Sequence, residues 1–178
     1  IPSLFLTGLG TGGGLHRWKN PARDLLVYHP PQPDCTLEML NRYQDQPWRV
    51  LPLRLRYTWK GLAKPGDRRH FTTLLLPHAP MLNPAELAAA ITTLADTADL
   101  TVLRIAAGTD REDWVVLNET GDAVTAGDLE TDARQLHLTI RTDLKPARHL
   151  LMVGGTYVKL KGETLATAAK EAVLDKDL

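Results

Sequence analysis

A stretch of alternating residues, 49–60 (RVLPLRLRYTWK), constrains the fold more than any other part of the chain. Apolar side chains occupy one parity, at Leu51, Leu53, Leu55, Tyr57 and Trp59. The other parity holds Pro52, Arg54, Arg56, Thr58 and Lys60. A two-residue period is typical of a β-strand with one buried face. A polar connection, 61–69, and a second apolar run, His70 to Leu76, follow. They predict two long antiparallel strands joined by a loop.

Short apolar segments separated by turn-forming residues continue through the rest of the chain. They predict strands at 4–7, 25–29, 101–105, 114–118, 123–125, 136–142, 149–153, 157–160 and 164–166. Residues 37–43 fit a strand or a short helix, and residues 167–178 fit a terminal helix or a frayed end. Strands of this length and regular spacing favour a sandwich or jelly roll.

One segment has the features of a helix. Asn83 fits the cap position, Pro84 the first helical position and Glu86 the first turn. Apolar residues follow with helical spacing at Leu87, Ile91 and Leu94. The predicted fold is therefore all-β, an antiparallel β-sandwich of jelly-roll or supersandwich type, with one packed α-helix near residues 84–95.

The length of 178 residues suits one domain, and we expect residues 1–178 to form a single β-sandwich. The chain starts at Ile1, inside an expected strand. We therefore expect it to be the C-terminal fragment of a longer protein.

Composition argues against several classes of partner and cofactor. With 21 basic and 21 acidic residues, the chain has no net field to attract nucleic acid, and no apolar run approaches the ~20 residues that span a membrane. Cys35 is the sole cysteine, so no intrachain disulfide or cysteine zinc site is available. The six histidines lack the spacing of a local metal site. We expect no cofactor, no metal, no nucleic acid and no membrane as partner.

Glycines near the start of the chain form a G-x-G-x-x-G pattern at Gly8, Gly10 and Gly13. This pattern after a strand suggests a nucleotide-binding enzyme, which would need a helix after Gly14 and a parallel sheet. Asn20-Pro21 follows closely, and the intervening residues show no apolar stripe at helical spacing. A loop that joins two strands is the favoured interpretation.

Two groups of residues are candidates for carbohydrate binding. Trp18 and His16 belong to the segment His16-Arg17-Trp18-Lys19-Asn20, in which a flat ring for stacking on a pyranose is flanked by polar groups. The alternative is that Trp18 covers a sheet edge. Arg54 and Arg56, with Lys60, share the outward parity of the central strand, and Arg68 and Arg69 lie across the loop. This basic patch suits an acidic polysaccharide; the alternatives are an acidic surface of another domain, or solvent.

No catalytic residue follows from the sequence. Asp110, Glu112 and Asp113 are expected to lie in a turn, and nothing brings them together as a glycosidase-like pair. The sequon Asn118-Glu119-Thr120 coincides with an expected turn.

Several segments in order resemble the C-terminal β-sandwich region of heparinase II/III-like polysaccharide lyases. They are RYTWKG, KPGD, FTTLLLPHAP, TVLRI, DWVVLN and GGTYVKLKGETL, within Leu51 to Leu165. The resemblance implies an N-terminal helical domain in the same chain and β-elimination of acidic polysaccharides by the whole protein. Tyrosine and histidine catalysts of that family come mainly from the helical domain and the earlier part of the sheet domain, so none is carried over.

The expected function is that of a non-catalytic β-sandwich domain of a secreted or periplasmic, polysaccharide-lyase-like protein. It would serve as a scaffold and as a cleft wall for an acidic polysaccharide. The alternative function is an autonomous carbohydrate-binding module that uses Trp18, His16, Arg54 and Arg56.

Overall fold

The computed structural model describes residues 3–6, 24–32, 35–40, 54–61, 64–67, 70–78, 83–145 and 148–178. The chain divides into two compact units, Ile1–Pro84 and Ala85–Leu178. The expectation of a single domain over residues 1–178 stays a prediction.

The described residues of the first unit form two antiparallel sheets. One has the order β1-β2-β5, with β1 (Ser3–Leu6), β2 (Asp24–Tyr28) and β5 (Leu74–His78). The other pairs β3 (Cys35–Leu40) with β4 (Arg54–Trp59). These elements confirm the strands expected at 4–7 and 25–29. Residues 37–43 fitted either a strand or a short helix, and their described part, 37–40, lies in the strand β3.

The predicted pairing of the central strand with the next apolar run is wrong. β4 pairs with β3, with Cys35 opposite Trp59, whereas β5 pairs with β2, with Asp24 opposite His78. β5 also begins at Leu74 rather than at His70. Alternation identifies a strand and its buried face, but it does not select the neighbouring strand. The cost of closing a longer loop grows slowly, so sequence proximity is a weak guide to pairing.

The alternation predicted for the central strand is visible in its described side chains. Arg56 and Lys60 are exposed, while Tyr57 is half-buried. The Tyr57 ring stacks on His29 at 4.7 Å between ring centroids, and Phe71 meets it edge-on at 4.9 Å. One face of β4 therefore packs against aromatic neighbours. On the opposite parity Arg56 and Lys60 face solvent, whereas Thr58 is half-buried. Leu51 and Leu53 lie outside the described residues.

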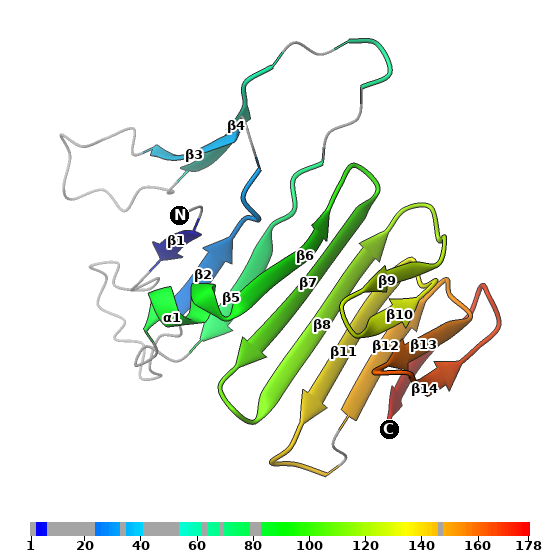
Figure 1. Ribbon diagram of the computed structural model, residues 1–178. Helices are drawn as coiled ribbons and strands as arrows, with labels where there is room; N and C mark the ends of the chain where they lie inside the picture. The colour runs from blue at the N-terminus through cyan, green and yellow to red at the C-terminus, as the bar shows by residue number, and fades with distance from the viewer. Residues whose placement is uncertain are drawn as a thin grey trace, which may run out of the picture. The chain divides into compact units, whose positions relative to one another are not determined.

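The second unit is built from two antiparallel sheets (Figure 1). The broad sheet has the order β15-β12-β11-β8-β7-β6. Its strands are β6 (Ile91–Asp96), β7 (Leu100–Ala107), β8 (Arg111–Asn118), β11 (Gln135–Arg141), β12 (Arg148–Val153) and β15 (Val173–Asp177). The small sheet has the order β14-β13-β10-β9. Its strands are β9 (Val124–Ala126), β10 (Leu129–Thr131), β13 (Tyr157–Leu160) and β14 (Glu163–Thr167).

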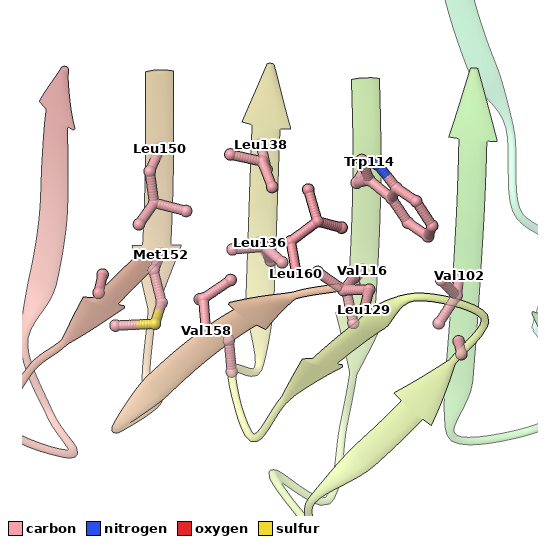
Figure 2. Close-up of a cluster of buried hydrophobic side chains, with 13 residues drawn as sticks. Val102, Trp114, Val116, Leu129, Leu136, Leu138, Leu150, Met152, Val158 and Leu160 are labelled. Atoms are coloured by element: carbon pink, nitrogen blue, oxygen red, sulfur yellow. The ribbon is translucent and has the colours of Figure 1, made fainter. Parts of the chain in front are cut away.

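The hydrophobic core lies between these two sheets (Figure 2). Trp114, Leu136 and Leu138 point into it from the broad sheet, and Leu129 and Val158 meet them from the small sheet. In the sequence, Leu136, Leu138 and Ile140 share one parity of residues 135–141, and His137 and Thr139 share the other, which predicts a strand with one buried face. This prediction is confirmed for Leu136 and Leu138, which are fully buried while the side chains between them are not. The all-β antiparallel sandwich predicted from the spacing of the strands is therefore the fold of this unit.

The helix predicted near residues 84–95 begins where expected but is much shorter. α1 spans Pro84–Ala89, and β6 starts at Ile91. The run Ile91-Thr92-Thr93 is β-branched and favours a strand, and β6 pairs with β7. A bulge between Thr93 and Ala95 leaves Leu94 at the surface. The helical spacing of Leu87, Ile91 and Leu94 therefore does not mark one buried helix face, because Ile91 and Leu94 belong to β6.

The C-terminal segment is neither a helix nor a frayed end. β15 pairs with β12 along its length, from Val153 opposite Val173 to His149 opposite Asp177. Leu174 and Leu178 pack against the hydrophobic core. Burial of these two side chains explains why a charged, alanine-rich tail adds a strand to the broad sheet.

Candidate functional site

The structure describes only some of the residues that were predicted to bind carbohydrate. Trp18 and His16 lie outside the described residues, as does the segment Gly8 to Gly14. Arg54 begins β4, and its side chain is outside what the structure describes. Arg56 is exposed, with its Nη1 atom 4.0 Å from Glu38 Oε2.

The position of Glu38 changes the expected character of the basic patch. Glu38 stands directly opposite Arg56 in the β3–β4 register. Both side chains are more than half exposed, so the pair contributes little to stability, but it places an anion beside the cation. Lys60 is exposed, and Arg68 and Arg69 lie outside the described residues. Binding of an acidic polysaccharide at this strand stays a prediction.

A compact polar cluster surrounds Asp113 on the outer face of the broad sheet, the face away from the small sheet. Arg111 Nε donates to Asp113 Oδ2 at 2.6 Å, and Arg111 Nη2 donates to Oδ1 at 3.1 Å. Thr139 Oγ1 donates to Oδ1 at 2.6 Å, and His137 Nε2 lies 3.4 Å from the same atom. The β8–β11 register places Asp113 opposite Thr139, which brings these groups together.

The Asp113 carboxylate is held in its charged form. Burial raises its pKa, but hydrogen bonds from His137, Arg111 and Thr139 outweigh burial and lower the pKa to about 2. Asp113 is the one buried carboxylate among the described residues. A general acid or base works best with a pKa near the operating pH, so this group is suited to structure rather than to proton transfer at neutral pH.

Glu112 belongs to a separate cluster on the opposite face of β8. Its Oε2 atom accepts a hydrogen bond from Arg104 Nη2 at 3.0 Å, and its Oε1 atom accepts one from Trp114 Nε1 at 2.6 Å. The Arg104 guanidinium lies 5.6 Å from the centroid of the Trp114 ring. Burial raises the pKa of Glu112, but the hydrogen bonds from Arg104 and Trp114 outweigh this effect, so the pKa lies below its ordinary value. The indole N–H of the buried Trp114 therefore has a hydrogen-bond acceptor in this cluster.

The expectation that Asp110, Glu112 and Asp113 share a turn is wrong for two of them. β8 begins at Arg111, so Glu112 and Asp113 are strand residues and their side chains alternate between the two faces. They form no carboxylate pair.

A second histidine–carboxylate pair joins β12 and β15. His149 Nε2 lies 3.0 Å from Asp175 Oδ1, and both side chains are largely exposed. In the register, Thr139 faces His149, which faces Asp177. A row of polar and titratable side chains therefore extends over β11, β12 and β15 on the outer face of the broad sheet. Within the described ranges, no three histidine, cysteine or acidic residues are grouped so that they could hold a metal ion.

A shallow, open hollow of about 430 Å³ lies at the end of the broad sheet where β8 stops and β11 starts. Its lining residues are Leu117, Asn118, Glu119, Arg134 and Gln135. Asn118 is buried and organises the adjoining turn: its Nδ2 donates to Asp122 O at 2.9 Å, and its Oδ1 accepts from Gly121 N at 3.1 Å. The amide that the sequon would present for glycosylation is thus engaged within the fold.

The sequence contained only a partial signal for these sites. His137 and Thr139 were recognisable as neighbours on the polar side of one strand, but Asp113 was assigned to a turn because β8 was expected to start at Trp114. Arg134 lies in the connection between β10 and β11, outside any alternating pattern. Nothing in the local sequence distinguishes Arg134 from other exposed arginines.

No protein-family model matches this chain, and comparison with curated proteins yields no match. Within the described residues, no helix has the length and apolar character to cross a membrane.

Proposed function

We propose that this chain is a non-catalytic β-sandwich part of a carbohydrate-active, polysaccharide-lyase-like protein. In that role it is a scaffold and forms one wall of a cleft for an acidic polysaccharide. The proposal draws on the resemblance of segments within Leu51 to Leu165 to heparinase II/III-like lyases, and the antiparallel sandwich of residues 91–177 is compatible with it. An N-terminal helical domain of the same chain and a secreted or periplasmic location belong to this proposal.

The environment of Asp113, the one buried carboxylate among the described residues, supports the non-catalytic part of the proposal because it removes this group as a candidate base. Its carboxylate accepts hydrogen bonds from Arg111 and Thr139 and lies close to His137. A pKa of about 2 keeps it ionised at neutral pH. β-Elimination requires a group that removes a proton from the sugar ring, and a base with so low a pKa has little driving force for that step.

Incubation of the chain with uronate polymers tests the proposal directly. β-Elimination leaves an unsaturated uronate that absorbs ultraviolet light, so the reaction is followed by absorbance, with an active lyase as the positive control. We expect no increase in absorbance from this chain alone. A sustained increase that scales with protein concentration would overturn the non-catalytic assignment.

The second candidate function is an autonomous carbohydrate-binding module. The hollow beside Arg134 favours it, because this hollow combines a cation, an amide and an exposed leucine at one surface. Binding to a panel of acidic glycans that is lost in Trp18→Ala and retained in Trp18→Phe would support the module, with Trp18 as its stacking platform. A lack of binding across the panel would favour a scaffold role without the cleft-wall contact.

A further inference from the structure

We infer that the hollow lined by Leu117, Glu119, Arg134 and Gln135 is a subsite for a carboxylate-bearing pyranose, with Arg134 as the anion-binding group. The inference rests on the proposed contact with acidic polysaccharide and adds a location and a ligand chemistry. It concerns residues other than those that the sequence suggested. All of them belong to the second unit.

The backbone of Arg134 is held on both sides. Its amide donates to Val153 O at 3.0 Å, and its carbonyl accepts from Asn118 N at 2.8 Å. These bonds connect the residue to the ends of β12 and β8, on either side of β11. The point from which the side chain leaves the backbone is therefore fixed by the sheet.

The side chain of Arg134 lies along two glycine turns. A Cβ atom built at Gly154 would come within 3.2 Å of Arg134 Cδ and 3.3 Å of its Cγ, and one built at Gly121 would lie 3.4 Å from its Nε. Both glycines have positive φ, 65° and 70°, which residues with a side chain rarely adopt. The absence of side chains at these turns leaves a path for the arginine stem. Packing along this path reduces the rotamer entropy that Arg134 would lose on binding a ligand.

Among the described residues, Arg134 is the one arginine of the second unit whose guanidinium has no acidic partner. Four arginines of this unit form ion pairs: Arg104 with Glu112, Arg111 with Asp113, Arg141 with Asp143 and Arg148 with Glu163. Arg134 forms no ion pair with any residue that the structure describes. Its five donors are therefore available to a carboxylate, which a guanidinium can bind through two parallel hydrogen bonds.

The other lining groups suit a sugar ring. Leu117 is 43% exposed and offers an apolar contact, and Gln135 stands directly opposite it in the β8–β11 register. The Gln135 amide can donate to and accept from ring hydroxyls, and Glu119 can accept from them. A uronate would supply a carboxylate for Arg134, an apolar C–H face for Leu117, and hydroxyl groups for Gln135 and Glu119. A neutral sugar would leave the arginine unpaired.

Calorimetric titration of the whole chain at low salt tests the subsite. The probes are a short oligogalacturonate and the same oligomer with its carboxyls methyl-esterified, which removes the charge while keeping the sugar. We expect Arg134→Gln to weaken binding of the charged oligomer about fivefold or more, as for loss of a charge-assisted hydrogen bond at a partly exposed site. Arg141→Gln, in a partly exposed arginine at the other end of β11, is the matched control, and we expect less than about a twofold change because Arg141 is already paired with Asp143.

The outcomes separate this inference from the proposed function. Binding that is unaffected by Arg134→Gln, or reduced equally by both variants, would overturn the subsite while leaving contact with acidic polysaccharide in place. If no acidic oligomer or polymer binds the wild-type chain, both the subsite and the proposed polysaccharide contact fail. Equal affinity of wild-type protein for charged and esterified oligomers would also overturn the role of Arg134. Unchanged fluorescence emission and unfolding midpoint show that each variant is folded.

Discussion

The carboxylate of Asp113 is charged in a position that is almost closed to solvent, and three neighbouring side chains compensate for the burial. Its pKa of about 2 lies below the ordinary value of 3.8. Folding therefore favours the ionised form, by about 2 kcal/mol from this difference in pKa. We expect Asp113→Asn to lower the free energy of unfolding by about 1–2 kcal/mol at pH 7, measured by denaturant titration.

The effect of Asp113→Asn depends on pH in a defined direction. A group whose pKa is lowered by folding stabilises the protein above its unfolded-state pKa, and this contribution is lost as pH falls through the folded-state value. We expect the difference between wild type and variant to be constant above about pH 5, and to shrink between about pH 4 and pH 2. Asp143→Asn, in an exposed carboxylate, is the control and should change stability little. A difference that stays constant down to pH 2 would contradict the assigned role of the Asp113 charge.

At the scale of single elements, β12 offers a direct test of the two faces of the broad sheet. Leu150 is fully buried in the core, whereas Leu151, the next residue, is 37% exposed on the outer face. We expect Leu150→Ala to lower the free energy of unfolding by about 2–5 kcal/mol, because it leaves a cavity among packed side chains. Leu151→Ala should cost less than about 1 kcal/mol. Both are measured by chemical denaturation.

The two leucine variants are matched, since each removes the same atoms from the same strand. Equal losses of stability, or a larger loss for Leu151→Ala, would mean that β12 pairs with a register shifted by one residue. Such a shift exchanges the buried and exposed faces of a strand.

At the scale of the whole molecule, the core of the second unit is made entirely from residues after position 85. Its buried cluster runs from Val102 to Ala166 and contains Trp114, the one tryptophan of that unit. We expect residues 85–178, produced alone, to unfold cooperatively in denaturant, with blue-shifted tryptophan emission from the buried Trp114 in the folded state. Red-shifted emission and a gradual transition would show that this unit requires residues 1–84 to fold.

Local patterns in the sequence were sufficient for much of the fold. The strand at 157–160 was predicted with the bounds that the structure has, and the inward set Leu136 and Leu138 followed from alternation alone. The proposed carbohydrate site could not be predicted in this way. Alternation describes one strand at a time, whereas the surroundings of Arg134 come from three separate connections that meet at the end of the broad sheet.

Side-chain periodicity along this chain was enough to establish an antiparallel β-sheet protein and the inward residues of several strands, because burial of every second residue is a property of each strand alone. Pairing of β4 with β3, the early end of α1 and the addition of β15 to the broad sheet became clear only from the folded arrangement. The pairing of β4 and the addition of β15 depend on contacts between residues distant in sequence, which outweigh local preference where they bury apolar side chains such as Leu174. The helix α1 ends early because the β-branched run that follows it enters β6, which pairs with β7. The same holds for Asp113 and Arg134, whose chemical character comes from the strands and turns that the fold places beside them.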